Sequence, residues 1–199
     1  GLIPSRGLGT GRRIVIAVGL AWLPLVIWAA WKQLLFAGIA PEPLLRHFGI
    51  HTPFLLALPL LIASEALVQR SLRRIVPLLV SSGLVDEATK PAFLVALQRA
   101  RRMRDSRVAL AVILTLVVAT TLAGWQQTDH IHELAWAIPV VPGSFGAWWY
   151  SYVSRPLFSV VLFAWLWRLV VITSVFWRIA RVDLRLAPTH PDRAGGLGF

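Results

Sequence analysis

Four long apolar runs most strongly constrain what this chain can fold into. They lie at about residues 14–31, 52–68, 108–123 and 157–177. A helix needs roughly 20 apolar residues to cross the hydrocarbon core of a bilayer, so each run suits one pass. The runs predict an all-α integral membrane protein with four transmembrane helices, organised as a single domain over residues 1–199.

The composition supports a membrane protein and excludes several kinds of site. Only 15% of the residues are charged and 57% are hydrophobic, whereas soluble domains are about a quarter charged. The chain has no cysteine. Disulfides, cysteine-ligated metals and thiol catalysis are therefore excluded.

The basic residues predict the orientation in the membrane. Most of them lie before the first run, between the second and third, and after the fourth, and the other two connections hold only Lys32, Arg46 and Arg155. Lysine and arginine are enriched in cytoplasmic connections. The distribution therefore predicts that both termini are cytoplasmic.

The connection over residues 69–107 predicts a basic helical hairpin on the cytoplasmic side. Its first helix should stop at Ser81-Ser82-Gly83, and its second should begin near Thr89 with Pro91 in the first turn. Such a hairpin would lie on the anionic inner leaflet or against a partner. Nucleic acid is not predicted as a partner, because the inner leaflet already explains the positive charge. The contact residues predicted on the second helix are Arg99, Arg101, Arg102 and Arg104.

The outer connection over residues 124–156 is rich in aromatic residues, which anchor at the headgroup level. Trp148 and Trp149 are its predicted membrane-surface or partner contacts. Prolines and glycines predict a short interfacial helix near residues 130–138, followed by an irregular segment on the outer surface. The helix-breaking residues are Pro139, Pro142, Gly143 and Gly146.

Arg168 lies in the middle of the fourth run, and Glu65 is the only acid inside any run. An arginine at the centre of a bilayer needs a carboxylate, a polar partner or a water-filled cavity. We expect an interhelical charge pair between Arg168 and Glu65. The same two residues could instead line an ion or proton pathway.

Two groups of histidines resemble metal ligands only weakly. The run Asp129-His130-Ile131-His132-Glu133 places its imidazoles about 200° apart on a helix, although they would share one side of an extended segment. His47 and His51 share a helix face, but Gly49 and Pro53 weaken that helix. No metal site, catalytic residue or cofactor is predicted.

The end of the chain carries the most specific motif. Residues 165–168 read Trp-Leu-Trp-Arg, and residues 188–199 read Pro-Thr-His-Pro-Asp-Arg-Ala-Gly-Gly-Leu-Gly-Phe. This combination resembles a family of uncharacterised bacterial multi-pass inner-membrane proteins. The resemblance implies a longer protein with further membrane helices after Phe199, and it implies no activity. Its recognisable tail positions are His190, Asp192, Arg193, Gly195 and Gly196.

The expected function is therefore that of a non-enzymatic subunit of a larger complex in the bacterial inner membrane, with a structural or stabilising role. A photosynthetic or respiratory assembly is one setting that fits. The expected partners are the lipid bilayer and other membrane proteins, and the aromatic residues would allow contact with lipid or pigment. The alternative is a transport or channel component that uses Arg168 and Glu65.

Overall fold

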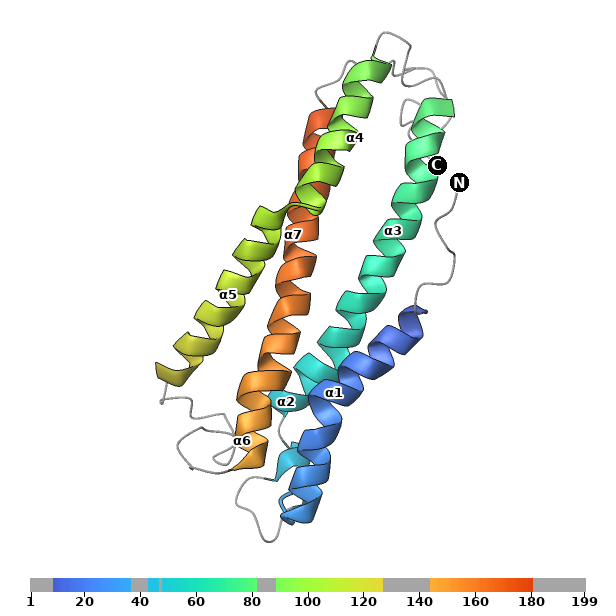
Figure 1. Cartoon of the computed structure of the whole chain (residues 1–199). Helices are drawn as coiled ribbons and strands as arrows, with labels where there is room; N and C mark the ends of the chain where they lie inside the picture. Colours follow the sequence, from blue (N-terminus) through green and yellow to red (C-terminus); the bar gives the residue numbers. More distant parts are fainter. Residues whose placement is uncertain (1–8, 37–42, 47, 82–88, 127–143, 181–199) are drawn as a thin grey trace. The chain divides into compact units, whose positions relative to one another are not determined.

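The structure is a computed structural model, and it describes residues 9–36, 43–46, 48–81, 89–126 and 144–180. Within these ranges every regular element is a helix, as Figure 1 shows. The elements are α1 (Thr10–Trp31), η1 (Leu44–Arg46), α2 (Phe48–His51), η2 (Thr52–Ala57), α3 (Leu58–Ser81), α4 (Lys90–Arg104), α5 (Arg107–Gln126), α6 (Phe145–Trp149), η3 (Tyr150–Ser154) and α7 (Arg155–Ile179).

Three helices are long and apolar enough to cross a membrane: Thr10–Trp31, Phe48–Leu78 and Phe145–Ile179. The number becomes four if α4 and α5, which are bent by 41° at their junction, form one broken span. The predicted all-helical class and the apolar, span-length helices are thereby confirmed for the described part of the chain.

Two of these helices are longer than the apolar runs that predict them. η2 and η3 are π-helical turns, and they join α2 to α3 and α6 to α7 without a break. Pro53 lies within η2, and Pro156 lies two residues past η3. Prolines and π-turns are the usual sites at which a long helix bends rather than stops.

The prediction of an irregular segment up to residue 156 is wrong from Phe145 onward. The helix begins there, and the Ser144 hydroxyl caps it by accepting a hydrogen bond from the backbone N–H of Ala147 at 3.4 Å. Gly146 lies inside α6 and is buried. One glycine costs a helix about 1 kcal/mol, which burial of this face against α1 outweighs.

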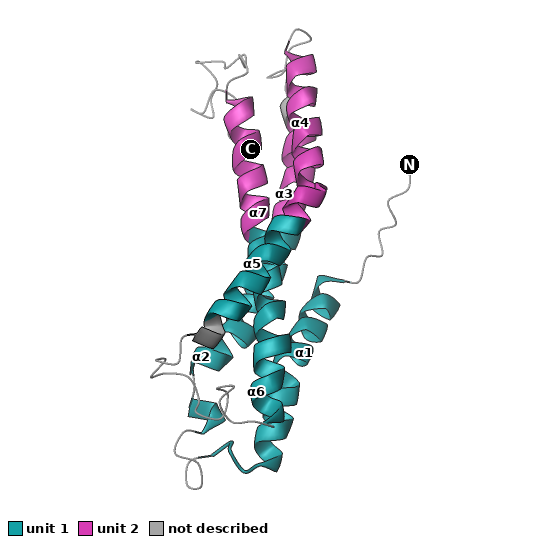
Figure 2. Cartoon of the chain, turned by 60° about the vertical axis from the view of Figure 1, so that its left-hand side comes forward, with its two compact units in different colours: residues 1–66, 111–165 teal, residues 67–110, 166–199 magenta. Residues whose placement is uncertain are grey.

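The chain forms two compact units, coloured in Figure 2, and we describe each by itself. Unit 1 comprises residues 1–66 and 111–165. Its core is formed by seven side chains of α1, η1, α2, η2 and α3. They are Ala21, Leu25, Ala29, Leu44, Ile50, Phe54 and Leu58.

Aromatic side chains from η3 and α7 complete this core. Phe54 makes edge-to-face contacts with Tyr150 and Phe158, with ring centroids 6.3 and 6.4 Å apart. Edge-to-face pairs of this kind add about 0.5–1.5 kcal/mol to the burial of the rings themselves.

Unit 2 comprises residues 67–110 and 166–199. Its core is Phe93 of α4 and Ile179 of α7, with Ile75, Val76, Leu97 and Val175 packed around them. α3 ends at Ser81, and α4 begins at Lys90 with a proline in its first turn. The stop signal and the start of the second helix of the hairpin are therefore confirmed, and the first helix is continuous with the second apolar run.

Candidate functional site

A proline inside α1 creates a polar site in the middle of unit 1. Pro24 has no N–H, so the carbonyl of Leu20, four residues earlier, has no donor within its own helix. The indole Nε1–H of Trp149 donates to this carbonyl at 3.1 Å. In apolar surroundings a carbonyl freed by proline has to be satisfied by a neighbouring helix. Trp149 does this for α1.

The adjacent carbonyl receives a second bond from the same segment. The hydroxyl of Ser154, which is completely buried, donates to the carbonyl of Ala21 at 2.6 Å. The two bonds hold η3 and α6 against α1, next to Pro24. Sequence reasoning missed Ser154. The proline does predict that Leu20 needs a donor, but it does not identify the donor.

His51 is fixed by two hydrogen bonds within unit 1. Trp22 donates from Nε1 to His51 Nδ1 at 3.1 Å, and His51 Nε2 lies 2.9 Å from the carbonyl of Leu44. An indole can only donate, so Nδ1 is the acceptor and Nε2 carries the proton that Leu44 accepts. Both ring nitrogens are occupied, which leaves neither for a metal. Its predicted companion His47 lies outside the described residues.

Glu65 and Arg168, the predicted charge pair, are both half-buried. Glu65 belongs to unit 1 and Arg168 to unit 2. A hydrogen bond inside unit 1 joins their two helices nearby, because Trp165 Nε1 donates to Ser64 Oγ at 2.7 Å. Ser64 in turn donates to the carbonyl of Leu61 at 2.9 Å. The charge pair itself stays a prediction.

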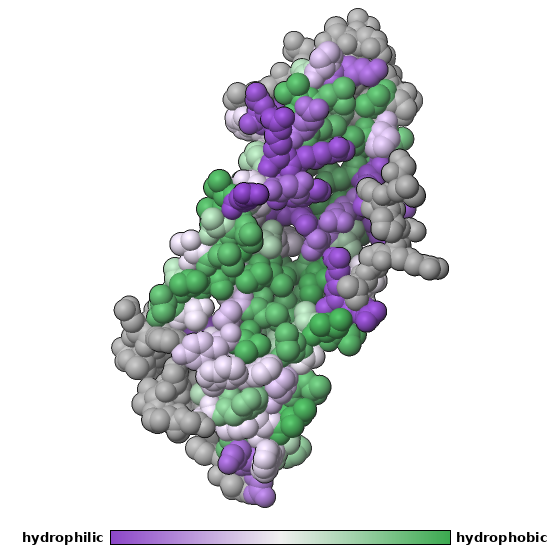
Figure 3. Space-filling view, viewed as in Figure 1, coloured by the Kyte–Doolittle hydropathy of each residue, from purple (hydrophilic) through white to green (hydrophobic). Residues whose placement is uncertain are grey.

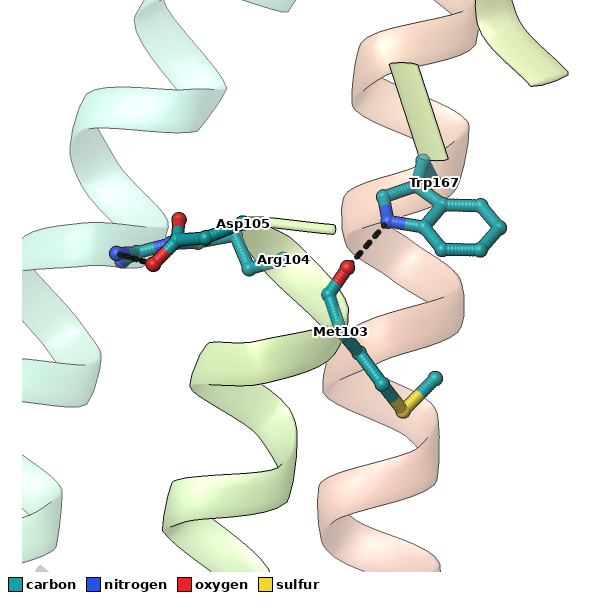
Figure 4. Close-up of polar contacts among 4 residues, drawn as sticks. All are labelled: Met103, Arg104, Asp105 and Trp167. Carbon is teal, nitrogen blue, oxygen red and sulfur yellow. Dashed lines mark hydrogen bonds and ion pairs between the residues drawn. The ribbon is translucent and has the colours of Figure 1, made fainter. Parts of the chain in front are cut away.

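The four predicted contact arginines of α4 are all exposed, whereas Phe93 and Ala96 of the same helix are buried. Of the four, Arg104 binds Asp105 through two hydrogen bonds, at 2.9 and 3.1 Å (Figure 4). These bonds lower the pKa of the Asp105 carboxyl and raise the pKa of Arg104. α4 therefore packs inside unit 2 through Phe93, while its four arginines stay exposed.

Figure 4 also shows how α7 contacts the end of α4 inside unit 2. Trp167 Nε1 donates to the carbonyl of Met103 at 3.2 Å, and Ser174 Oγ lies 3.8 Å from the Met103 sulfur. Trp167 therefore lies beside the polar turn that joins α4 to α5.

The two predicted surface tryptophans lie in different surroundings. Trp148 is 52% exposed, and its ring centroid lies 6.0 Å from that of Tyr152. Trp149 is half-buried and packs against the core of unit 1. Of the two tryptophans, only Trp148 exposes more than half of its surface.

Several predicted features lie outside the described residues. These are the run from Asp129 to Glu133 and the whole tail motif, including His190, Asp192, Arg193, Gly195 and Gly196. In the part of the chain that the structure describes, no group of three or more His, Cys, Asp or Glu side chains could hold a metal ion.

Comparison with known proteins finds no relative of this chain. No protein-family model matches the chain, and neither a curated protein nor a solved structure is significantly similar to it.

Proposed function

We propose that this chain is a non-enzymatic subunit of a larger complex in the bacterial inner membrane, with four passes, both termini cytoplasmic and a basic cytoplasmic hairpin. The resemblance of the tail motif to bacterial multi-pass membrane proteins supports this setting. The lipid bilayer and other membrane proteins are the proposed partners, and the role is structural.

The observation that carries the proposal is the apolar surface of α5. Five of its large side chains each expose between 50% and 67% of their area: Val108, Leu110, Leu114, Val118 and Leu122. Figure 3 shows this helix in hydrophobic colours. Exposed apolar surface of this extent marks a membrane or protein interface. The hydroxyls of Thr120 and Thr121 donate to backbone carbonyls of their own helix, so they do not favour a polar transport path.

One face of α5 is suited to a neighbouring helix. Ala111, Thr115, Ala119 and Ala123 recur every four residues, and all are exposed. Small residues at this spacing let two helix backbones approach closely within a membrane. Lipid tails gain nothing from such a face, whereas a partner helix gains close packing.

The test is the mass of the assembly after gentle extraction of native membrane into polymer-bounded lipid discs. We expect a particle heavier than this chain alone, with a second protein at fixed stoichiometry. Ala119→Leu should release that protein by filling the small face. Val118→Leu, a matched change at a neighbouring exposed position, should retain it. A particle that contains this chain alone would overturn the proposal.

A further inference from the structure

We propose that His51 makes a proton-sensitive contact between α1 and α2, which is closed while the imidazole is neutral and opens when the ring takes up a second proton. All residues of this contact belong to unit 1. The inference goes beyond the proposed role in a complex, because it concerns the response of the chain to acid and needs no partner protein.

The contact requires a neutral imidazole in one tautomer. The indole Nε1–H of Trp22 donates to His51 Nδ1 at 3.1 Å, and His51 Nε2 lies 2.9 Å from the carbonyl oxygen of Leu44. An indole N–H cannot accept and a carbonyl cannot donate. Nδ1 therefore carries the lone pair and Nε2 carries the proton, so each nitrogen of the neutral ring is used once.

A second proton breaks only one of these two bonds. It would go to Nδ1, which is the ring nitrogen without a proton. In a charged imidazole both nitrogens are donors, so Nδ1–H would face the N–H of Trp22 and that hydrogen bond would be lost. The bond from Nε2 to Leu44 would remain, because Nε2 is the donor in both states.

The two bonds attach His51 to different segments. Leu44 lies in η1, and its backbone N–H donates to the carbonyl of Leu34 at 2.9 Å, in the connection that follows α1. Trp22 lies in α1 itself. Protonation of His51 should therefore loosen α2 from α1 while the connection stays attached to α2. Ile50 of α2 remains part of the apolar core, so the expected change is local and the unit does not unfold.

The surroundings of His51 contain no carboxylate that would stabilise the charged ring. In the described part of unit 1 the only acid is Glu65, which lies fourteen residues further along the same helix, or about 21 Å at 1.5 Å per residue. Glu42 and His47 lie outside the described residues. A proton on His51 thus gains no ion pair with a described residue that would offset the lost bond. The other charged or titratable groups on or next to the elements around this core are Arg12, Arg13, Lys32, Arg46, Tyr150, Tyr152 and Arg155.

Protons can reach the ring, because His51 is half-buried and both of its bonds are partly exposed. Imidazoles ordinarily take up a proton between about pH 7.5 and 5.5. In the proposed topology the connection between the first and second passes faces the outer side of the membrane. The contact would then respond to acid outside the cell.

Nitrogen-15 NMR of histidine-labelled protein in lipid discs tests the tautomer. Above about pH 8, the signals of His51 should show an unprotonated Nδ1 and a protonated Nε2, and they are assigned by their absence from His51→Gln. Acid should then protonate Nδ1. A ring that carries its proton on Nδ1 in the neutral state would refute the proposal.

Spin-label distances test the loosening, because the chain has no native cysteine. Cysteines replace Leu23 of α1 and Phe48 of α2, both of which are exposed. Acidification from about pH 7.5 to 5.5 should lengthen and broaden this distance. A control pair at Leu23 and Val160, which is also exposed and in unit 1, should keep its distance.

Substitutions assign the change to His51. His51→Gln cannot take up a proton and should show no response to acid. Trp22→Phe removes the donor, so the labels should be as far apart at neutral pH as in the acidified parent. A parent distance that ignores acid, or a response that persists undiminished in His51→Gln, would rule the contact out as a proton sensor. The response should survive replacement by Gln of the other four histidines, His47, His130, His132 and His190.

Discussion

The two compact units use polar side chains in opposite ways. In unit 1, Ser154, Trp149 and His51 bond to backbone carbonyls of other elements. In unit 2 the four arginines of α4 are exposed, and Phe93 of the same helix forms the core.

The difference follows from where each polar group can be satisfied. A neutral donor saturated by a carbonyl can be buried among apolar side chains at little cost. A guanidinium group carries five donors and a charge, so water or phosphate satisfies it better than a core does. Polar groups thus hold unit 1 together from inside, and they make the surface of unit 2 attractive to anions.

The largest expected effect is on the core of unit 2. Phe93 is almost fully buried, and Phe93→Ala should destabilise this unit by about 3–5 kcal/mol. Hydrogen exchange should show faster exchange in α4 and in residues 166–179, with little change in α1. Equal acceleration in α1 would mean that the two units unfold as one, and the comparison between them would fail.

The next effect tests the inward bonds of unit 1. Trp149→Phe keeps most of the ring but removes the donor to Leu20, and a carbonyl left without a donor in apolar surroundings costs about 1–3 kcal/mol. Pro24→Ala restores a backbone N–H four residues after Leu20. The double variant should therefore lose less stability than the sum of the two single variants, as measured by unfolding in detergent. Strict additivity would show that the bond to Leu20 is unimportant.

These bonds also mark the limit of prediction from sequence. Apolar runs and proline and glycine signals predict the helices and the start of α4, because these depend on local composition. Ser154 and Trp149 form bonds across about 130 positions of the chain, which no local pattern specifies. Gly146 misled the prediction because helix propensity of about 1 kcal/mol is weaker than packing.

The error over residues 145–154 also changes how Arg155 is interpreted. With residues 145–154 read as irregular, Arg155 lies at an outer surface and the fourth pass begins after it. Once α6 and η3 continue into α7, ten more helical residues precede Arg155. Arg155 therefore follows ten helical residues and does not mark the outer end of the helix.

Replacing Arg168 and Glu65 tests the predicted charge pair by magnitude. Loss of one partner of a fully buried pair would cost about 3–5 kcal/mol, and the double Leu variant would recover much of it. Both side chains are half-buried, and partly solvated pairs contribute less. We therefore expect Arg168→Leu or Glu65→Leu to cost no more than about 1 kcal/mol in detergent unfolding. A loss above about 3 kcal/mol with recovery in the double variant would show that the pair is fully desolvated.

The smallest effect on stability, and the most specific for unit 2, concerns the exposed arginines of α4. Arg99→Gln should change the unfolding free energy by less than about 0.5 kcal/mol, since surface substitutions rarely do more. Association of the intact protein in discs with anionic vesicles should weaken by about 1 kcal/mol per arginine removed, and salt should weaken it further. Lys90→Gln offers a matched control at the other end of the same helix. If Arg99→Gln unfolds the protein while leaving association intact, the α4 arginines support the fold as the polar groups of unit 1 do, and the contrast between the units disappears.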